Sequence, residues 1–265
     1  MVVKQQMTDQ AVTGRQRNIQ AKTPVIDFHS HILPNMDDGS RNLEMSVQML
    51  DRMSEMGVGT VLATSHFYGF KEPASRFLQR RDKAWTTLES ALRDDHPRVL
   101  LGAEVAFFSG LTKLHRTELD ALCMEGTRTL LVEMPFEAWS GYELEVLSNL
   151  TLDRGYHVLL AHFERFVGFQ HHKDIWDRVL DLPIDLQINA GSLLPLLSRR
   201  KWLKWYQKGY LPVLGSDSHN LDSRPPNLTD ARRILEKKYG QDILDQIDAL
   251  GAQLLEPVLE PVNAF

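Results

Sequence analysis

The chain has 265 residues, of which 43% are apolar and 25% are charged, and its formal net charge at neutral pH is -5. This length suits one α/β-barrel-sized domain or two small ones, and the acidic balance gives no general attraction to nucleic acid or to an anionic membrane. The single cysteine, Cys123, excludes an intramolecular disulfide, and no apolar run approaches the ~18 residues of a membrane span. We therefore expect a soluble, cytoplasmic protein whose partners are small molecules or other proteins.

The start of the chain has a different character from the rest. Residues 1–24 are polar, show no clear strand or helix period and lack the apolar core of a signal peptide. We expect residues 1–24 to be a mobile leader, residues 25–255 to form a single domain and residues 256–265 to be an irregular tail.

The stretch from Val25 to Gly39, VIDFHSHILPNMDDG, opens with a short apolar run and places Asp27, His29 and His31 at alternating positions. Alternate residues of a β-strand point to the same face, so a carboxylate and two imidazoles converge there. A His-x-His pair at a strand end can bind one metal ion with both rings. The alternative is two solvated histidines beside a turn, and this stretch alone does not decide between them.

Apolar runs and helical patterns alternate along the rest of the chain. A helical period from Leu43 to Met56 comes first, and Gly57 stands where a C-terminal cap belongs. The further strands expected are 59–63, 99–101, 129–132, 158–161, 184–188 and 211–214, and the further helices are 74–94, 110–123, 141–154, 171–181 and 193–208. Regular alternation of this kind predicts parallel strands with helices outside them.

Of the seven expected strands, six end in a histidine or an acid. A parallel barrel gathers the carboxyl ends of its strands at one mouth, so these side chains would meet in one pocket. An open doubly wound sheet would instead place functional residues at one switch point. The pattern therefore favours a (β/α) barrel.

The side chains that follow the strands favour a metal site. A single histidine or glutamate at a strand end is usually a solvated or hydrogen-bonded residue, but here histidines, two glutamates and Asp217 all share that position. Mixed nitrogen and carboxylate ligands suit manganese, iron or zinc, and the absence of thiolates argues against a structural zinc. The histidines at 96, 115, 157, 171 and 172 lie in expected helices or loops and have no assigned role.

The motifs HSHILPNMDDGS, ATSHF, LGAEV, LVEMPF, AHFERF, QINAGSL and GSDSHNLDSRPP occur in this order. As an ordered set they resemble the bacterial tyrosine phosphatases of the PHP (polymerase and histidinol phosphatase) superfamily, the CpsB/CapC/YwqE type associated with capsular and exopolysaccharide synthesis. The resemblance runs from Val25 to about Tyr239. AHFERF stands where the family often has AHPERY, and the leader is longer than in most members. Neither departure touches an expected ligand.

This resemblance implies a distorted, TIM-like (β/α)7 barrel that holds three divalent metal ions, usually manganese, with iron or zinc as alternatives. The implied ligands are His29, His31, Glu104 and Asp217 for the first ion, Glu104, Glu133 and His162 for the second, and His66, His219 and Asp38 for the third. Asp37 is the alternative to Asp38, because the resemblance does not decide which of the two acids before Gly39 binds the ion.

The resemblance also implies a metal-dependent protein-tyrosine phosphatase, with a bacterial tyrosine autokinase of polysaccharide export as its protein substrate. A metal-bridged hydroxide would attack phosphorus. Arg165 and Arg224 resemble the phosphate-binding arginines of the family, and the alternative for both is a surface salt bridge. Asp217 or His219 would protonate the leaving phenolate. The alternative activities are a histidinol-phosphatase-like enzyme or an amidohydrolase-type metal hydrolase, and a noncatalytic binding protein is a third reading.

Two expectations concern residues outside the ligand set. Conventional tyrosine phosphatases use a thiolate in a Cys-x5-Arg loop, but Arg128 comes one position too early after Cys123, so we expect an inert thiol at a helix end. Five aromatic residues follow strand-end ligands closely enough to line the mouth of a barrel, or else to pack on its rim: Phe67, Tyr68, Phe70, Phe136 and Trp139.

Overall fold

The computed structural model describes residues 24–170, 173–207 and 210–257. The expected leader, apart from Pro24, lies outside the described residues, as do most of the expected tail and His171 and His172. Within the described part, strands and helices alternate from Val25 to Leu254, as the sequence predicts.

The strand pairings in the described residues are all parallel and make two sheets. One sheet contains β1 (Val25–Ser30), β2 (Val58–Ala63) and β4 (Arg98–Leu101). The other contains β3 (His66–Phe67), β5 (Glu104–Ala106), β6 (Thr129–Glu133), β7 (His157–Leu160), β8 (Ile184–Asn189) and β9 (Val213–Gly215). In both sheets the order of the strands follows the order of the chain, which places consecutive strand ends side by side.

Two of the expected strands are each split in two. Thr64 and Ser65 separate β2 from β3, and Gly102 and Ala103 separate β4 from β5. His66 and Glu104 were expected to follow strands, but they begin the short strands β3 and β5 and pair with each other in register. Each of these two chain segments therefore contributes its first strand, β2 or β4, to one sheet and its second strand, β3 or β5, to the other. The second strands carry His66 and Glu104.

Hydrogen bonds join β1 to the segment that follows β9. The amide of Asp217 donates to the carbonyl of His29 at 2.7 Å, and the amide of His31 donates to the carbonyl of Ser218 at 2.9 Å. The buried carboxylate of Asp27 adds a third link, because its Oδ1 accepts the amide of Ser216 at 2.8 Å. The first and last strands of the chain thus lie side by side.

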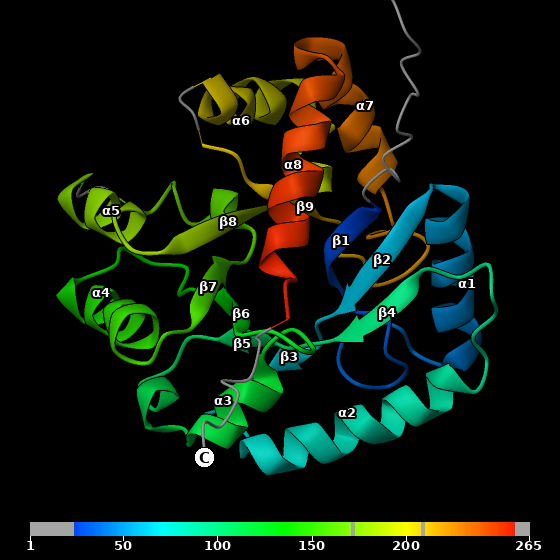
Figure 1. The fold of residues 1–265 in the computed structure, drawn as a ribbon, viewed down its shortest axis with the longest axis horizontal. Helices are drawn as coiled ribbons and strands as arrows, with labels where there is room; N and C mark the ends of the chain where they lie inside the picture. The colour runs from blue at the N-terminus through cyan, green and yellow to red at the C-terminus, as the bar shows by residue number, and fades with distance from the viewer. Residues whose placement is uncertain (1–23, 171–172, 208–209, 258–265) are drawn as a thin grey trace, which may run out of the picture.

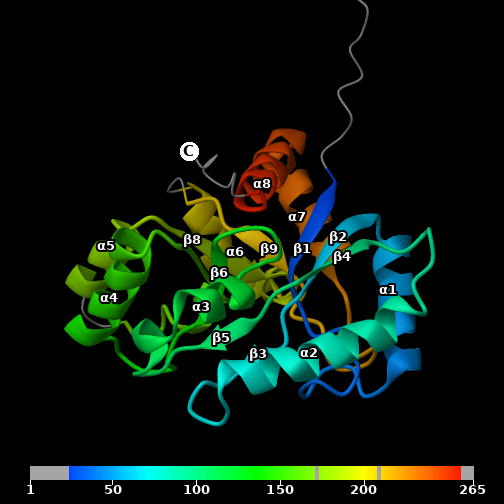
Figure 2. The same ribbon diagram turned by 60° about the horizontal axis from the view of Figure 1, so that its bottom comes forward.

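Helices lie outside the strands, and Figures 1 and 2 show α1 and α2 on one side of the molecule and α4 and α5 on the opposite side. The helices are α1 (Leu43–Glu55), α2 (Ala74–Glu89), α3 (Arg116–Leu122), α4 (Gly141–Ser148), α5 (Lys173–Leu180), α6 (Leu196–Gln207), α7 (Leu228–Tyr239) and α8 (Gln241–Leu254). The helices α7 and α8 were not expected from the sequence. Among the residues described, no helix has the length and apolar character needed to cross a membrane.

Local side chains explain where the expected helices differ from the observed ones. The expected helix 110–123 is broken because His115 and Glu118 form a capping box that starts α3 afresh at Arg116. The expected helix 141–154 changes after Ser148 into a π-helical turn, Asn149–Asp153. The expected helix 74–94 ends early, at Glu89.

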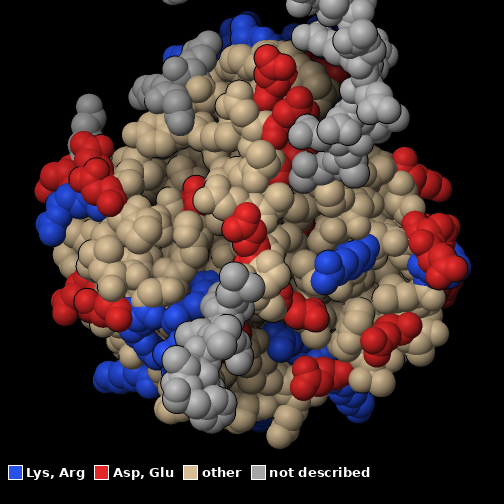
Figure 3. Space-filling model, viewed as in Figure 1, with Lys and Arg blue, Asp and Glu red and all other residues tan. Residues whose placement is uncertain are grey.

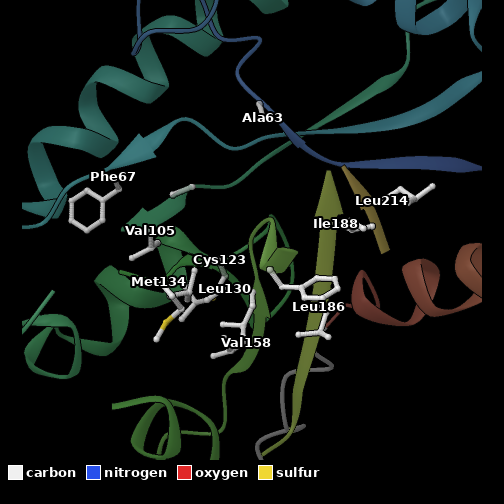
Figure 4. Close-up of a cluster of buried hydrophobic side chains, with 14 of the residues drawn as sticks. Ala63, Phe67, Val105, Cys123, Leu130, Met134, Val158, Leu186, Ile188 and Leu214 are labelled. Carbon is white, nitrogen blue, oxygen red and sulfur yellow. The ribbon is translucent and has the colours of Figure 1, made fainter. Parts of the chain in front are cut away.

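The strands are buried on both faces, as parallel strands usually are. A large apolar cluster fills the space between strands and helices, and Figure 4 shows part of it around Leu130, Val158 and Leu186. A smaller cluster collects side chains from β1, β2, β4, β6, β7 and β9, together with the end of α8: Ile26, Phe28, Leu62, Leu100, Met124, Leu131, Leu159, Ala161, Val213 and Leu254. Side chains of six strands therefore share one small interior.

The helix α8 crosses the middle of the view in Figure 1 and packs against this smaller cluster. Gly251 allows the close approach, since a Cβ at this position would lie 2.9 Å from the ring of Phe28. A buried ion pair fixes α8 to α7, with Arg232 donating to both carboxylate oxygens of Asp248 at 2.6 and 2.7 Å. On the same face, Figure 3 shows acidic side chains along α8 and charges of both signs around the rim.

Candidate metal centre

Glu104 lies at the centre of the candidate site and is fully buried. Its Oε2 lies 2.7 Å from Nδ1 of His66, 3.2 Å from Nε2 of His29 and 3.4 Å from Nε2 of His31. Its Oε1 lies 2.9 Å from Nε2 of His162. Burial raises the pKa of this carboxyl, but the nearby imidazoles, His29 first, outweigh burial and hold the pKa well below its usual range. One ionised carboxylate therefore faces imidazoles from β1, β3, the loop after β1 and the turn after β7.

Three groups of side chains each place their candidate ligand atoms within 4.8 Å of one another. The groups are His31, Asp38, His66 and His219, then His29, His31 and Glu104, and then His66, Glu104 and Glu133. His162 joins the last group, because its Nε2 lies 3.4 Å from Oε1 of Glu133. Together with Asp217, the structure brings all nine of the expected ligands into one connected cluster.

Asp217 presents one oxygen to this cluster and the other to the arginines. Its Oδ1 lies 3.6 Å from Nε2 of His29 and 3.5 Å from Nε2 of His31. Its Oδ2 accepts a hydrogen bond of 2.7 Å from Arg165 and forms a salt bridge with Nη2 of Arg224, also at 2.7 Å. Burial raises the pKa of the Asp217 carboxyl, but His29 and His31 lower the pKa far more and keep the group ionised.

The two acids before Gly39 have different surroundings. Asp37 is committed to structure, because its Oδ2 lies 2.8 Å from Nδ1 of His31 and accepts the amide of His66 at 2.9 Å, while its Oδ1 accepts the amide of Gly39. Asp38 is exposed, and its Oδ1 lies 3.4 Å from Nε2 of His66 and 3.4 Å from Nε2 of His219. The geometry favours Asp38 as a ligand and Asp37 as the group that orients His31.

Two of the candidate ligands have left-handed backbone conformations. His162 has φ 30° directly after β7, and Asp217 has φ 52° shortly after β9. Such conformations are uncommon for residues other than glycine and are concentrated at functional sites. At these positions the side chain of His162 contacts Glu104, and that of Asp217 contacts His29 and His31.

The donor atoms of the cluster fit a divalent metal ion. In the described part of the chain, four buried atoms of this cluster have no hydrogen-bond partner: Nδ1 of His66, Oε2 of Glu104, Nδ1 of His162 and Nε2 of His219. Buried polar atoms are normally satisfied, so unpartnered nitrogen and carboxylate atoms in one cluster are a donor set that a bound cation would satisfy. Imidazole and carboxylate ligands without thiolate suit manganese, iron or zinc.

The arginines border a pocket of about 210 Å³ beside the cluster. Arg165 and Arg224 line it together with Asp217, and both guanidinium groups are more than a third exposed. The expected alternative for these arginines was a surface salt bridge. Both do form salt bridges, and both bind the same nearly buried carboxylate of the candidate metal centre.

Sequence reasoning missed Gln187 and Asn189, which lie among the candidate ligands. Gln187 is fully buried and contacts His29, and Asn189 donates to Oδ2 of Asp217. The available signal was the alternation of Asp185, Gln187 and Asn189 in β8. Parallel strands are usually continuous apolar runs, so two amides on one face of such a strand indicate a polar function.

Two of the expected aromatic residues lie beside the candidate ligands and one borders them. The ring of Tyr68 stacks on His66 at 5.2 Å, and the ring of Phe136 stacks on His162 at 6.1 Å. Phe70 is exposed and packs against Tyr68. Phe67 and Trp139 were expected near the mouth as well, but both are buried in the apolar core.

The described histidines outside the cluster have local partners. His96 lies 3.0 Å from Asp51, His115 caps α3, and His157 lies 2.7 Å from Asp185. None of the three belongs to the groups that could hold an ion.

Cys123 is a buried side chain of the apolar core, as Figure 4 shows. Burial raises the pKa of its thiol, so the nucleophilic thiolate is disfavoured. We expect Cys123→Ser to keep most of any phosphatase activity, measured as kcat/KM in a correctly folded sample. A loss of more than about a hundredfold, about 2.7 kcal/mol in the barrier, would instead indicate cysteine chemistry.

Fold and site together define a class of protein. Parallel strands carry histidines and acids to one end, where they form a cluster with several overlapping groups of metal ligands. This arrangement is typical of a metal-dependent hydrolase of the α/β type.

Comparison with known proteins identifies the family. The family model "Capsular polysaccharide synthesis, CpsB/CapC" matches residues 25–255, and the chain belongs to this family. Tyrosine-protein phosphatase CpsB of Streptococcus pneumoniae is 29% identical over 232 residues, which cover 82% of this chain and 91% of CpsB. Tyrosine-protein phosphatase YwqE of Bacillus subtilis is 27% identical over 226 residues, which cover 83% of this chain and 87% of YwqE.

A solved structure agrees with these matches. It comes from the crystal structures of YwqE from Bacillus subtilis and CpsB from Streptococcus pneumoniae, described as unique metal-dependent tyrosine phosphatases. Its TM-score is 0.73 at 25% identity, and the match covers 89% of this chain and 100% of the other. The predicted family is confirmed.

Proposed function

We propose that this protein is a metal-dependent protein-tyrosine phosphatase. The observation that carries the proposal is the cluster of nine candidate ligands around Glu104, with two arginines bound to one of them, Asp217. A phosphomonoester is an anion that hydrolyses very slowly without a catalyst. The same chemistry is named for the relatives CpsB and YwqE, which supports the proposal.

We infer that the strands form a distorted (β/α)7 barrel in a single domain, residues 25–255. Counting β2 with β3 and β4 with β5 gives seven strand positions in chain order. The contacts between β1 and the segment after β9, and the small apolar cluster shared by six strands, support closure of the ring.

The proposed ligands are divided among three divalent ions, and the proposed metal is manganese, with iron or zinc as alternatives. The assignment is His29, His31, Glu104 and Asp217 for the first ion, Glu104, Glu133 and His162 for the second, and His66, His219 and Asp38 for the third. When bound, such ions supply Lewis acidity that neutralises phosphoryl oxygens and lowers the pKa of water. Ligand chemistry supports manganese, iron and zinc alike.

The remaining residues of the site bind and orient the phosphoryl group. Arg165 and Arg224 are proposed to turn from Asp217 to the phosphate, because a planar guanidinium matches two phosphate oxygens at once. Asp217 and His219 were the candidates for protonating the leaving oxygen. Both stay candidates, because Oδ2 of Asp217 is released when the arginines turn to the phosphate. A phenolate is a good leaving group, so this proton transfer contributes little.

The proposed protein substrate is phosphotyrosine on a cognate bacterial tyrosine autokinase of capsular or exopolysaccharide export, in the cytoplasm. The family description and the names of the relatives support this choice of pathway and of modified residue. The rings of Tyr68 and Phe136, stacked on His66 and His162, support an aromatic substrate.

Metal removal tests the proposed function. We expect treatment with a strong chelator to abolish hydrolysis of an aryl phosphate, and added manganese to restore it. Metal content is measured on the same samples before and after chelation. Undiminished turnover by fully metal-free protein would contradict the proposal.

The aromatic rings predict a preference among phosphate esters. Tyr68 and Phe136 stack on His66 and His162, which contact different oxygens of Glu104, so an aryl group bound at the cluster gains ring contacts that an alkyl group cannot make. We expect kcat/KM for phosphotyrosine to exceed that for phosphoserine and histidinol phosphate by at least about tenfold, or about 1.4 kcal/mol. Equal or better turnover of histidinol phosphate would favour the histidinol-phosphatase-like alternative.

A further inference from the structure

The side chains of Gln187 and Asn189, here called the amide pair, connect two candidate ligands of the first ion. Nδ1 of His29 lies 3.1 Å from Oε1 of Gln187. Nε2 of Gln187 donates to Oδ1 of Asn189 at 3.0 Å, and Nδ2 of Asn189 donates to Oδ2 of Asp217 at 2.7 Å. The amide pair is buried, so these hydrogen bonds are protected from competition by water.

At both ends of this chain of hydrogen bonds, the partner determines which atom donates and which atom accepts. At one end, the backbone amide of His162 donates to Oε1 of Gln187 at 2.7 Å, and a backbone amide can only donate. The atom of Gln187 that faces His29 is therefore the oxygen. At the other end, Oδ2 of Asp217 accepts a hydrogen bond from the guanidinium of Arg165, which can only donate, so Asn189 presents its nitrogen to the same oxygen.

The fixed direction determines which atoms His29 and Asp217 offer to the cluster. Because Gln187 accepts, Nδ1 of His29 carries the hydrogen, and in the neutral ring Nε2 is left with its lone pair. That Nε2 is the atom that lies 3.2 Å from Oε2 of Glu104. Because Asn189 holds Oδ2 of Asp217, the other oxygen, Oδ1, faces His29 and His31.

We propose that Gln187 and Asn189 are positioning residues of the metal centre, which fix the tautomer of His29 and the orientation of Asp217. This inference rests on the proposed function only in requiring that the cluster binds a metal ion. Side chains that orient ligands in this way commonly contribute about 10- to 100-fold to metal affinity. Asn189 also lines the pocket that the arginines border, but the role proposed for it here is to hold Asp217.

The backbone around the amide pair is adapted to hold it. In the parallel register of β8 and β9, Gln187 pairs with Val213 and Asn189 pairs with Gly215. A Cβ at Gly215 would lie 2.8 Å from Nε2 of Gln187 and 2.6 Å from Cβ of His29. Glycine at this position thus leaves room for both side chains to meet beside the strand.

Asn189 also has a role that the arginines cannot fill. Oδ2 of Asp217 accepts hydrogen bonds from Arg165 and Asn189 and forms a salt bridge with Arg224. When the arginines turn to a phosphoryl group, Asn189 remains as the donor that holds Oδ2. The carboxylate then keeps its orientation through the catalytic cycle.

Two variants of the full-length chain separate the effect on the tautomer of His29 from the effect on the orientation of Asp217. Gln187→Met removes the acceptor for His29 and the donor to Asn189 while keeping a similar volume. Asn189→Leu removes the donor to Asp217 and leaves the bond between Gln187 and His29 in place. The matched control is Gln170→Met, since Gln170 also forms hydrogen bonds through both ends of its amide, but to backbone groups and not to a candidate ligand.

The readouts are manganese affinity by direct titration and the tautomer of His29 by nitrogen NMR of metal-free protein labelled in histidine, with His29→Gln used to assign the signal. We expect both amide variants to bind manganese about 10- to 100-fold more weakly than the wild type and the control. We expect the Nδ1-protonated form of His29 to be lost in Gln187→Met and retained in Asn189→Leu.

The outcomes distinguish this inference from the proposed function. Wild-type protein that binds no manganese, iron or zinc would contradict the proposed function itself. Wild-type protein that binds metal, with both variants within twofold of its affinity and an unchanged His29 tautomer, would overturn only the positioning role. If Gln187→Met fails to fold by circular dichroism, Asn189→Leu decides by its manganese affinity alone.

Discussion

Replacement of Glu104 by glutamine is expected to abolish catalysis and to remove more than one ion. The variant keeps the shape of the side chain but loses the charge that faces His29, His66 and His162. Because the carboxylate is shared between the proposed first and second ions, its loss weakens both sites. We expect kcat for an aryl phosphate to fall by at least about a thousandfold, or about 4 kcal/mol in the barrier. Steady-state kinetics and metal analysis measure the two effects.

Glu118→Gln is the matched control for this variant. Glu118 is a partly exposed residue of the capping box of α3 and lies outside the groups of candidate ligands, so its replacement affects helix stability and not the metal content. A Glu104→Gln protein that keeps its full complement of metal and near-normal turnover would exclude Glu104 as a shared ligand.

Removal of either arginine beside Asp217 is expected to impair catalysis and to leave the metal in place. Arg165 and Arg224 both contact Oδ2 of Asp217, which Asn189 still holds when one arginine is absent, and Arg224 also lies 3.9 Å from Oδ2 of Asp38. We expect Arg165→Ala and Arg224→Ala each to lower kcat/KM by about a hundredfold, or about 2.7 kcal/mol, because each removes a charged donor to the phosphoryl oxygens.

The control for the arginine variants is Arg128→Ala. Arg128 stacks on the ring of Tyr156 and binds the carbonyl of Arg154, so it has no contact with the cluster. Metal content is determined for all three proteins. Full activity in Arg165→Ala or Arg224→Ala would remove that arginine from the site, and a loss of metal would make it a support for Asp217 instead of a phosphate ligand.

The sequence predicts the course of the chain well where apolar periodicity controls the structure. Strands near 59–63, 129–132 and 184–188 and the helix after Leu43 were expected, and the structure has them within one or two residues. Periodicity does not reveal where local side chains interrupt an element. The break of the expected helix 110–123 depends on the cap formed by His115, and the split of β2 from β3 depends on backbone contacts between distant strands.

The candidate site was predictable as a set because its residues share one position in a repeated pattern, near the ends of parallel strands. The family resemblance favoured Asp38 over Asp37, but the residues alone could not separate them, since neighbouring acids in a loop differ only in the backbone conformation that tertiary contacts impose. The role of Gln187 was also hidden. An uncharged amide gives no chemical signal in a sequence until its partners, His29 and His162, are known.

The left-handed backbone at His162 and Asp217 places two candidate metal ligands and at the same time lowers the stability of the folded protein. Residues held in such conformations commonly cost about 1 to 3 kcal/mol each. The conformations of these two residues therefore lower the free energy of unfolding of the protein. Glycine accepts the same conformation freely, and at either position it would relieve the strain and delete a metal-binding group. Selection for a more stable protein and selection for a working centre therefore act in opposite directions at these two positions. Metal binding offsets part of this loss of stability, because an ion that binds only the folded state stabilises that state by mass action.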